Sequence, residues 1–126
     1  MPGNNINSKI FACAARFAGQ EVSRGDIINW ILKEYPGTNA SSLIPSDYCY
    51  NIVNKGSGIR LDSRVFEYVE RDGKWLYKCL GKNYAYNGDI AWKQKGSGRP
   101  ERKIVGKWTD GKPVIFEEYK EMLGLD

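Results

Sequence analysis

The sequence predicts an α+β fold, on three observations. Apolar residues recur at three- and four-residue steps in the stretches 5–17 and 23–35, which is the spacing of one face of a helix. Further along, two runs rich in aromatic and β-branched residues flank Asp72-Gly73, and this dipeptide is a strong signal for a β-hairpin turn. Helices are therefore expected before strands along the chain.

The first helix is expected from Asn5 to Phe17. Its apolar residues fall on one face, and Gly19 follows as a helix terminator. Nothing in this stretch suggests chemistry, so we interpret it as a scaffold that covers the backs of other helices.

The second helix has the clearest start signal. Ser23 can cap it, and Asp26 can return a hydrogen bond to the cap while its charge lies at the positive helix end. Apolar residues then repeat at helical spacing as far as Tyr35, and Pro36-Gly37 ends the helix. The side chains left for solvent are Arg24, Asn29, Lys33 and Glu34.

A third helix is expected from about Leu43 to Asn54, with its cap at Ser41 or Ser42. Pro45 falls in its first turn, where the backbone N–H groups have no helical partners in any case. On this register one face is rich in hydrogen-bonding groups. The side chains on that face are Ser46, Asp47, Tyr50, Asn51 and Asn54.

A β-hairpin is predicted over Val65–Leu80, with Arg71 and Lys74 at its tip. Two helices across a tight turn, followed by a hairpin, is the order of a winged helix-turn-helix. The second helix of that motif usually lies in the major groove of duplex DNA. Duplex DNA is therefore the expected ligand, and the hairpin is the expected wing.

Readout of the DNA sequence is expected from Asn51. Its planar amide carries a donor and an acceptor and can pair bidentately with an adenine edge. Tyr50 and Ser46 are expected as flanking contacts, with Asn54 on the same face. The alternative is a solvated helix face with Tyr50 packed on a neighbour. If the face reads DNA, Asn51→Ala should weaken binding to a preferred site by about 1–3 kcal/mol and leave random-sequence binding nearly unchanged.

Charge is distributed unevenly along the chain. Residues 1–54 hold four basic and four acidic groups, residues 55–107 hold thirteen against six, and residues 108–126 hold two against five. The basic middle indicates a polyanion partner, and the alternative is a solvated surface that is rich in lysine. The expected phosphate contacts are Lys55, Arg60, Arg64, Arg71, Lys74, Lys95, Arg99, Arg102 and Lys103.

The rest of the chain adds three segments. Tyr84 and Tyr86 suggest a short strand with both rings on one face, for core packing or, less often, for stacking on a base. Five of the eleven residues in 93–103 are Lys or Arg, which favours a phosphate-binding loop. In 104–126 we expect a hairpin that turns at Asp110-Gly111 and a short helix at about 116–123, an added layer that could contact a second copy.

Length and composition exclude several classes of protein. The 126 residues fit one domain, 1–126, with its core at about 6–80. No apolar run approaches the ~20 residues that span a bilayer, so we expect a cytoplasmic protein without a membrane partner. The three cysteines form no CxxC pair and there is no histidine. Zinc fingers, disulfide frameworks and His-dependent triads are therefore poor interpretations, and we expect no cofactor or metal.

The segment IPSDYCYN at 44–51, followed by Asn54-Lys55-Gly56 and the strand at 66–68, resembles small winged helix-turn-helix modules of prokaryotic proteins. Some of those modules are joined to nuclease domains in restriction-type systems. The resemblance covers roughly residues 6–80. It implies a non-catalytic DNA-binding role, regulatory or restriction-related, for the third helix and the hairpin.

Two rival functions remain. Glu118-Tyr119-Lys120 has the Glu-x-Lys form of metal-dependent nucleases, with Asp110 or Asp89 as a second acidic ligand. Such triplets are frequent in charged helices, so catalysis is the least favoured function. The other rival is a protein-interaction adaptor, because winged-helix folds also serve as docking modules.

Overall fold

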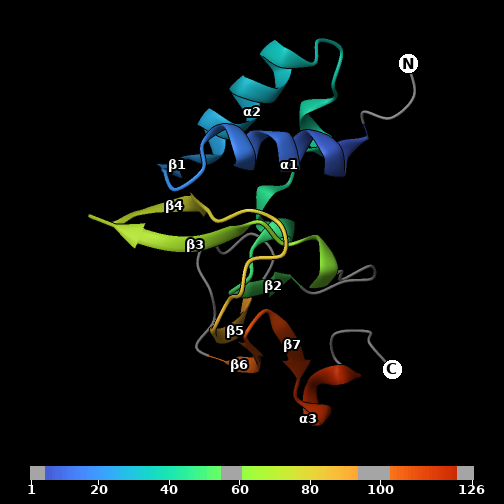
Figure 1. The fold of residues 1–126 in the computed structure, drawn as a ribbon, viewed down its shortest axis with the longest axis vertical. Coiled ribbons are helices and arrows are strands. Elements are labelled where there is room, and N and C mark those ends of the chain that lie inside the picture. The colour runs from blue at the N-terminus through green and yellow to red at the C-terminus, as the bar shows by residue number, and fades with distance from the viewer. Residues whose placement is uncertain (1–4, 55–60, 94–102, 122–126) are drawn as a thin grey trace.

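The fold combines helices with two β-sheets, which confirms the α+β class (Figure 1). The computed structural model describes residues 5–54, 61–93 and 103–121. The helices are α1 (Ile6–Arg16), α2 (Arg24–Glu34) and α3 (Glu117–Lys120), with 3-10 helices η1 (Ala40–Ser42), η2 (Pro45–Tyr48) and η3 (Leu61–Ser63). The strands are β1 (Glu21–Val22), β2 (Ile52–Asn54), β3 (Phe66–Arg71), β4 (Lys74–Cys79), β5 (Gly88–Lys93), β6 (Ile104–Thr109) and β7 (Lys112–Ile115).

The two N-terminal helices begin as the sequence predicts. Asn5 caps α1 by accepting a hydrogen bond from the Ser8 backbone N–H at 2.8 Å. Ser23 and Asp26 form the reciprocal capping box of α2, with bonds of 3.0 and 3.1 Å. Gly19 follows α1 with φ +80°, a conformation that glycine adopts at little cost.

The first sheet has the strand order β1-β4-β3 and contains the predicted hairpin. Asp72 and Gly73 both have positive φ, +54° and +78°, as expected for the central residues of a tight hairpin turn. In Figure 1, α1 and α2 lie on one side of this sheet and the second sheet lies on the other. Ile10, Ile27 and Phe66 are fully buried in the core that joins the helices to the first sheet.

The predicted third helix at Leu43–Asn54 is wrong. This stretch forms η1 and η2 and then the strand β2. Pro45 disfavours the helical conformation at the residue before it, and Ile44 has φ −120° and ψ 84°. The β-branched pair Ile52-Val53 then favours a strand.

Residues 49–53 lie between two cores. Cys49 and Ile52 belong to the core of the first sheet, whereas Tyr50 and Val53 belong to a second core beneath the second sheet. All of these side chains have an exposed fraction of 2% or less. A helix with one polar solvent-facing side cannot satisfy burial on two sides, so an extended segment replaces it.

This segment also joins the sheets. The Tyr50 backbone N–H donates to the carbonyl of Phe66 in β3 at 2.7 Å. The N–H of Ala91 in β5 donates to the Asn51 carbonyl at 2.9 Å. From Ile52 onward β2 pairs with β5 in parallel. The chain therefore leaves one sheet and enters the other at Asn51.

The second sheet has the order β2-β5-β6-β7. Its hairpin turns at Asp110-Gly111, as predicted, with φ of +48° and +77°. A Cβ on Gly111 would lie 2.9 Å from the Tyr84 carbonyl oxygen, so the turn packs directly on the loop before β5. The predicted terminal helix is confirmed over α3, and its expected end at Leu123 lies outside the described residues.

The predicted strand at Tyr84 and Tyr86 is wrong, because β5 begins only at Gly88. A turn at Lys82-Asn83, with φ +60° at Asn83, precedes this stretch, and residues 84–87 are irregular. The two rings consequently separate: Tyr86 is 7% exposed and Tyr84 is 46% exposed. Core packing is the role of Tyr86.

Every helix in the described ranges is too short or too polar to cross a bilayer.

Buried thiols make the fold sensitive to alkali. Burial, and secondarily the nearby Cys79, raises the pKa of Cys13 to about 12 from 9.0, and burial raises the pKa of Cys79 to about 11. The unfolded chain therefore releases these protons first, and the free energy of unfolding should fall as pH rises from about 9 through the two folded pKa values, about 11 and about 12.

Urea unfolding at pH 7 and pH 10.5 measures this loss. The Cys13→Ala and Cys79→Ala double variant, compared with itself at the two pH values, should lose less stability than the native chain. Equal losses would assign the alkaline sensitivity to other groups.

Candidate functional site

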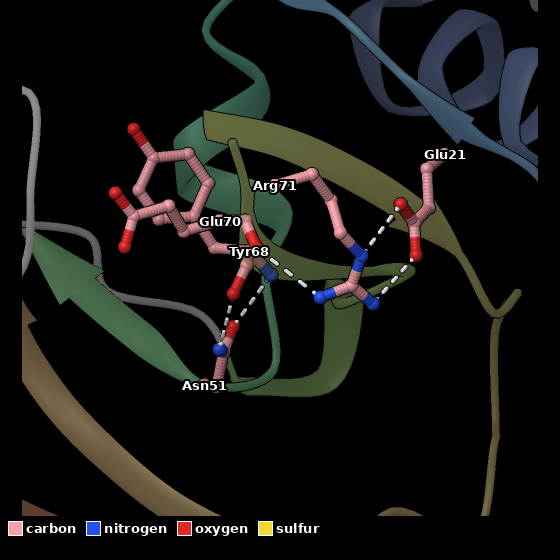
Figure 2. Close-up of polar contacts among 5 residues, drawn as sticks. All are labelled: Glu21, Asn51, Tyr68, Glu70 and Arg71. Atoms are coloured by element: carbon pink, nitrogen blue, oxygen red, sulfur yellow. Dashed lines mark hydrogen bonds and ion pairs between the residues drawn. The ribbon is translucent and has the colours of Figure 1, made fainter. Parts of the chain in front are cut away.

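Asn51 is bonded inside the protein. Its Nδ2 donates to the Tyr68 carbonyl and its Oδ1 accepts from the Tyr68 backbone N–H, each at 2.8 Å (Figure 2). The amide thus pairs with the edge of β3 as a peptide group would. The prediction that Asn51 reads a base edge is wrong, because both ends of its amide are already used.

Tyr50 is the centre of the second core. Its hydroxyl donates to the Gly81 carbonyl at 2.7 Å and accepts from the Tyr84 backbone N–H at 3.1 Å. Its ring stacks on Tyr86 with centroids 5.1 Å apart and meets the edge of Trp108 at 5.0 Å. Burial raises the pKa of Tyr50, and the bond from Tyr84 partly opposes that shift.

The predicted DNA contacts by Tyr50 and Ser46 are therefore wrong. Tyr50 is 2% exposed and Ser46 is 8% exposed, so neither side chain can meet a phosphate or a base on an outer surface. On the polar face of the expected helix, Tyr50 and Asn51 are bonded inside the protein, whereas Asp47 is exposed. Asn54 is the last residue of β2, and the structure does not describe its side chain, so its predicted DNA contact stays a prediction.

Arg64 is not a surface cation. It is 3% exposed, and its Nη1 donates to the carbonyls of Cys49 and Ile52 at 3.1 and 3.5 Å. It holds the crossing segment in place, and the prediction that it contacts phosphate is wrong. Burying a guanidinium is costly unless its N–H groups are bonded, as here.

Arg71 lies at the surface but is engaged. Its guanidinium forms two bonds to the Glu21 carboxylate, of 2.8 and 3.1 Å, and a third to the Glu70 carbonyl (Figure 2). This exposed pair ties the end of β3 to β1. A phosphate would have to compete with Glu21 for the same guanidinium.

Other expected cations are exposed. Lys74 lies beside the hairpin turn, and Lys103 places its Nζ 5.4 Å from the Trp92 ring centroid and 5.9 Å from that of Tyr119. The expected contacts that fall outside the described residues are Lys55, Arg60, Lys95, Arg99 and Arg102.

Two exposed lysines of the second sheet were missing from the sequence-based set. Lys107 pairs across β6 and β7 with Val114, and Thr109 pairs with Lys112. Because side chains alternate along strands, Lys107 and Lys112 lie on the same outer face. The polar and apolar alternation around Asp110-Gly111 was the signal that could have identified them.

A cleft opens beside Tyr50. Its volume is about 340 Å³. Three aromatic side chains, Tyr50, Tyr84 and Trp108, line it together with Leu61 and Pro113.

The polar part of the cleft comes from Arg64 and Asn83, with Gly111 at the β6–β7 turn. Trp108 is fixed by its Nε1, which donates to the Tyr50 carbonyl at 2.7 Å. Aromatic walls and the Asn83 amide suit a planar ligand with polar atoms on its edge.

The Glu-x-Lys triplet lies in α3. Lys120 of this triplet forms an ion pair of 3.1 Å with Glu117, the residue before the triplet. Within the described ranges no group of three or more His, Cys, Asp or Glu side chains is placed to hold a metal ion.

Fold and site together define an α+β protein of two joined sheets with an aromatic cleft and exposed lysines. The chain belongs to the family described as Domain of unknown function (DUF7225), whose model matches residues 5–115. It is 46% identical over 86 residues to the uncharacterized protein YnaC of Bacillus subtilis (strain 168), an alignment that covers 68% of this chain and 30% of YnaC. The chain thus matches under a third of that relative. No solved structure is detectably similar.

Proposed function

We propose that the chain is a non-catalytic domain that binds duplex DNA through exposed lysines and adjacent basic segments. The observation that carries this proposal is the charge balance, because residues 55–107 hold thirteen Lys or Arg against six Asp or Glu. Arg71 pairs with Glu21 and Lys120 pairs with Glu117, and neither ion pair includes Lys74, Lys103, Lys107 or Lys112. Exposed, uncompensated lysines attract a polyanion.

A winged-helix arrangement belongs to the same proposal, in a reduced form. α1, α2 and the β3–β4 hairpin follow in the expected order, and β1 adds to the hairpin beside β4. Since η1 and η2 stand where a recognition helix was expected, we assign DNA contact to the hairpin tip and the basic segments. Such contacts recognise the phosphate backbone more than the base sequence.

The resemblance to restriction-type modules favours a regulatory or restriction-related role in the cytoplasm, alongside a second copy or a separate protein partner. The alignment covers only 30% of YnaC. The proposal therefore concerns the DNA-binding role of this chain and assigns no further activity to it.

Salt dependence tests the proposal. Fluorescence anisotropy with a random-sequence duplex should give a log affinity that falls with log salt at a slope of roughly −4 to −5, if about five phosphates are neutralised. Lys74→Ala and Lys107→Ala should each weaken binding and reduce the magnitude of the slope by about 1.

Lys33→Ala is the matched control, because Lys33 is an exposed lysine of α2 in the charge-balanced N-terminal region. It should leave affinity and slope unchanged. A slope near zero for a measurable complex, or an equal effect of Lys33→Ala and Lys74→Ala, would reject these exposed lysines as the DNA contacts. Absence of binding at low salt would favour the protein-docking alternative.

A further inference from the structure

The cleft beside Tyr50 has the size of a small-molecule site. Its volume of about 340 Å³ falls within the range of about 300–1,000 Å³ that such sites occupy. Its buried walls are rigid, since Tyr50 and Trp108 are 2% and 5% exposed and are hydrogen-bonded to each other. A ligand would therefore meet a surface that is already formed.

Tyr84 differs from the other rings of the cleft. It is 46% exposed, and its ring centroid lies 6.3 Å from that of Tyr50 at a tilt of 54°. Its backbone is nevertheless fixed, because its N–H donates to the Tyr50 hydroxyl at 3.1 Å and its carbonyl accepts from Tyr86 at 2.8 Å. An exposed aromatic ring on a fixed backbone is suited to stacking on a planar ligand.

The polar side chains of the cleft select among planar ligands. Asn83 brings an exposed amide to the cleft. Arg64 also lines the cleft, with its Nη1 bonded to the carbonyls of Cys49 and Ile52. A nucleobase combines a π face for an aromatic ring with edge groups that can bond to the Asn83 amide. An aliphatic ligand has no π face on which the Tyr84 ring could stack.

We propose that the cleft receives a single unpaired base of a DNA strand, with Tyr84 stacked on the face of that base. This inference rests on the proposed DNA-binding function, since the exposed lysines would hold the strand. Base stacking on one aromatic side chain corresponds to about 5- to 100-fold in affinity.

Two matched duplexes test the inference, one fully paired and one with a single unpaired adenine. Anisotropy should show that the native chain binds the second duplex at least fivefold more tightly. Tyr84→Ala should abolish this preference, and Tyr84→Phe should keep it because the ring remains. Val114→Ala, which removes a 54% exposed side chain of β7 outside the cleft, should also keep it.

Free adenosine distinguishes the sources of a base. If the native chain binds adenosine and Tyr84→Ala does not, while the two duplexes bind equally, the cleft serves a free nucleoside and the proposal is overturned. Equal duplex binding without adenosine binding overturns it as well. If neither duplex binds, the DNA-binding function has failed, and adenosine binding that depends on Tyr84 would then identify a nucleoside site instead.

Discussion

Replacement of Asn51 with alanine is expected to lower the free energy of unfolding by about 2–4 kcal/mol. The change removes both bonds to Tyr68, each 2.8 Å long, and leaves a partly buried N–H and carbonyl without that partner. Each such loss costs about 1–3 kcal/mol. The bonds also hold the point where the chain passes from the first sheet to β2, so the loss should be felt in both sheets. Urea unfolding measures it.

Two further variants make the Asn51 result specific. Asn51→Asp can still accept from the Tyr68 N–H but cannot donate to the Tyr68 carbonyl, so its stability should lie nearer to that of Asn51→Ala than to the native value. Asn29→Ala changes an exposed asparagine of α2 and should be close to neutral. A stable Asn51→Ala protein with reduced preference for a particular DNA site would restore the base-reading role and refute the structural one.

Replacement of Tyr50 with alanine should be the most damaging single change in the second core. The ring contacts Tyr86 and Trp108 at centroid distances of 5.1 and 5.0 Å, and truncating a buried aromatic side chain costs about 3–5 kcal/mol. Near-UV circular dichroism should also change, because the neighbouring rings lose their fixed packing. Thermal unfolding and the near-UV spectrum measure the two effects.

Tyr50→Phe separates the ring from the hydroxyl. It keeps the aromatic packing but removes the bonds to the Gly81 carbonyl and from the Tyr84 N–H, so a smaller loss of about 1–3 kcal/mol is expected. If Tyr50→Ala keeps native stability and loses only DNA affinity, Tyr50 is a surface contact and the core assignment is wrong.

Elements with local causes could be predicted. The start of α2 follows from Ser23 and Asp26, which lie three residues apart and bond to each other. The two hairpins follow from Asp72-Gly73 and Asp110-Gly111, whose positive φ is a property of the residues at the turn itself. The excess of basic residues in 55–107 is likewise a property of the sequence alone.

The candidate site could be predicted less well, because its side chains have distant partners. Asn51 bonds to Tyr68, seventeen residues away, and the Tyr50 carbonyl accepts from Trp108, fifty-eight residues away. A run of hydrogen-bonding residues has the same pattern whether its partners are water, DNA or the protein itself. The cleft escaped prediction for the same reason, since its walls come from several separate segments.

By itself the sequence determined the α+β class, the helix caps, the hairpin turns and the basic middle of the chain, because each depends on residues close together or on composition. Only the tertiary structure decided the fate of residues 43–54. Their side chains are required by two cores on opposite sides, and burial on both sides favours an extended strand over a helix with one solvated face. That same long-range packing turned Tyr50, Asn51 and Arg64 inward and left Tyr84 exposed at the cleft.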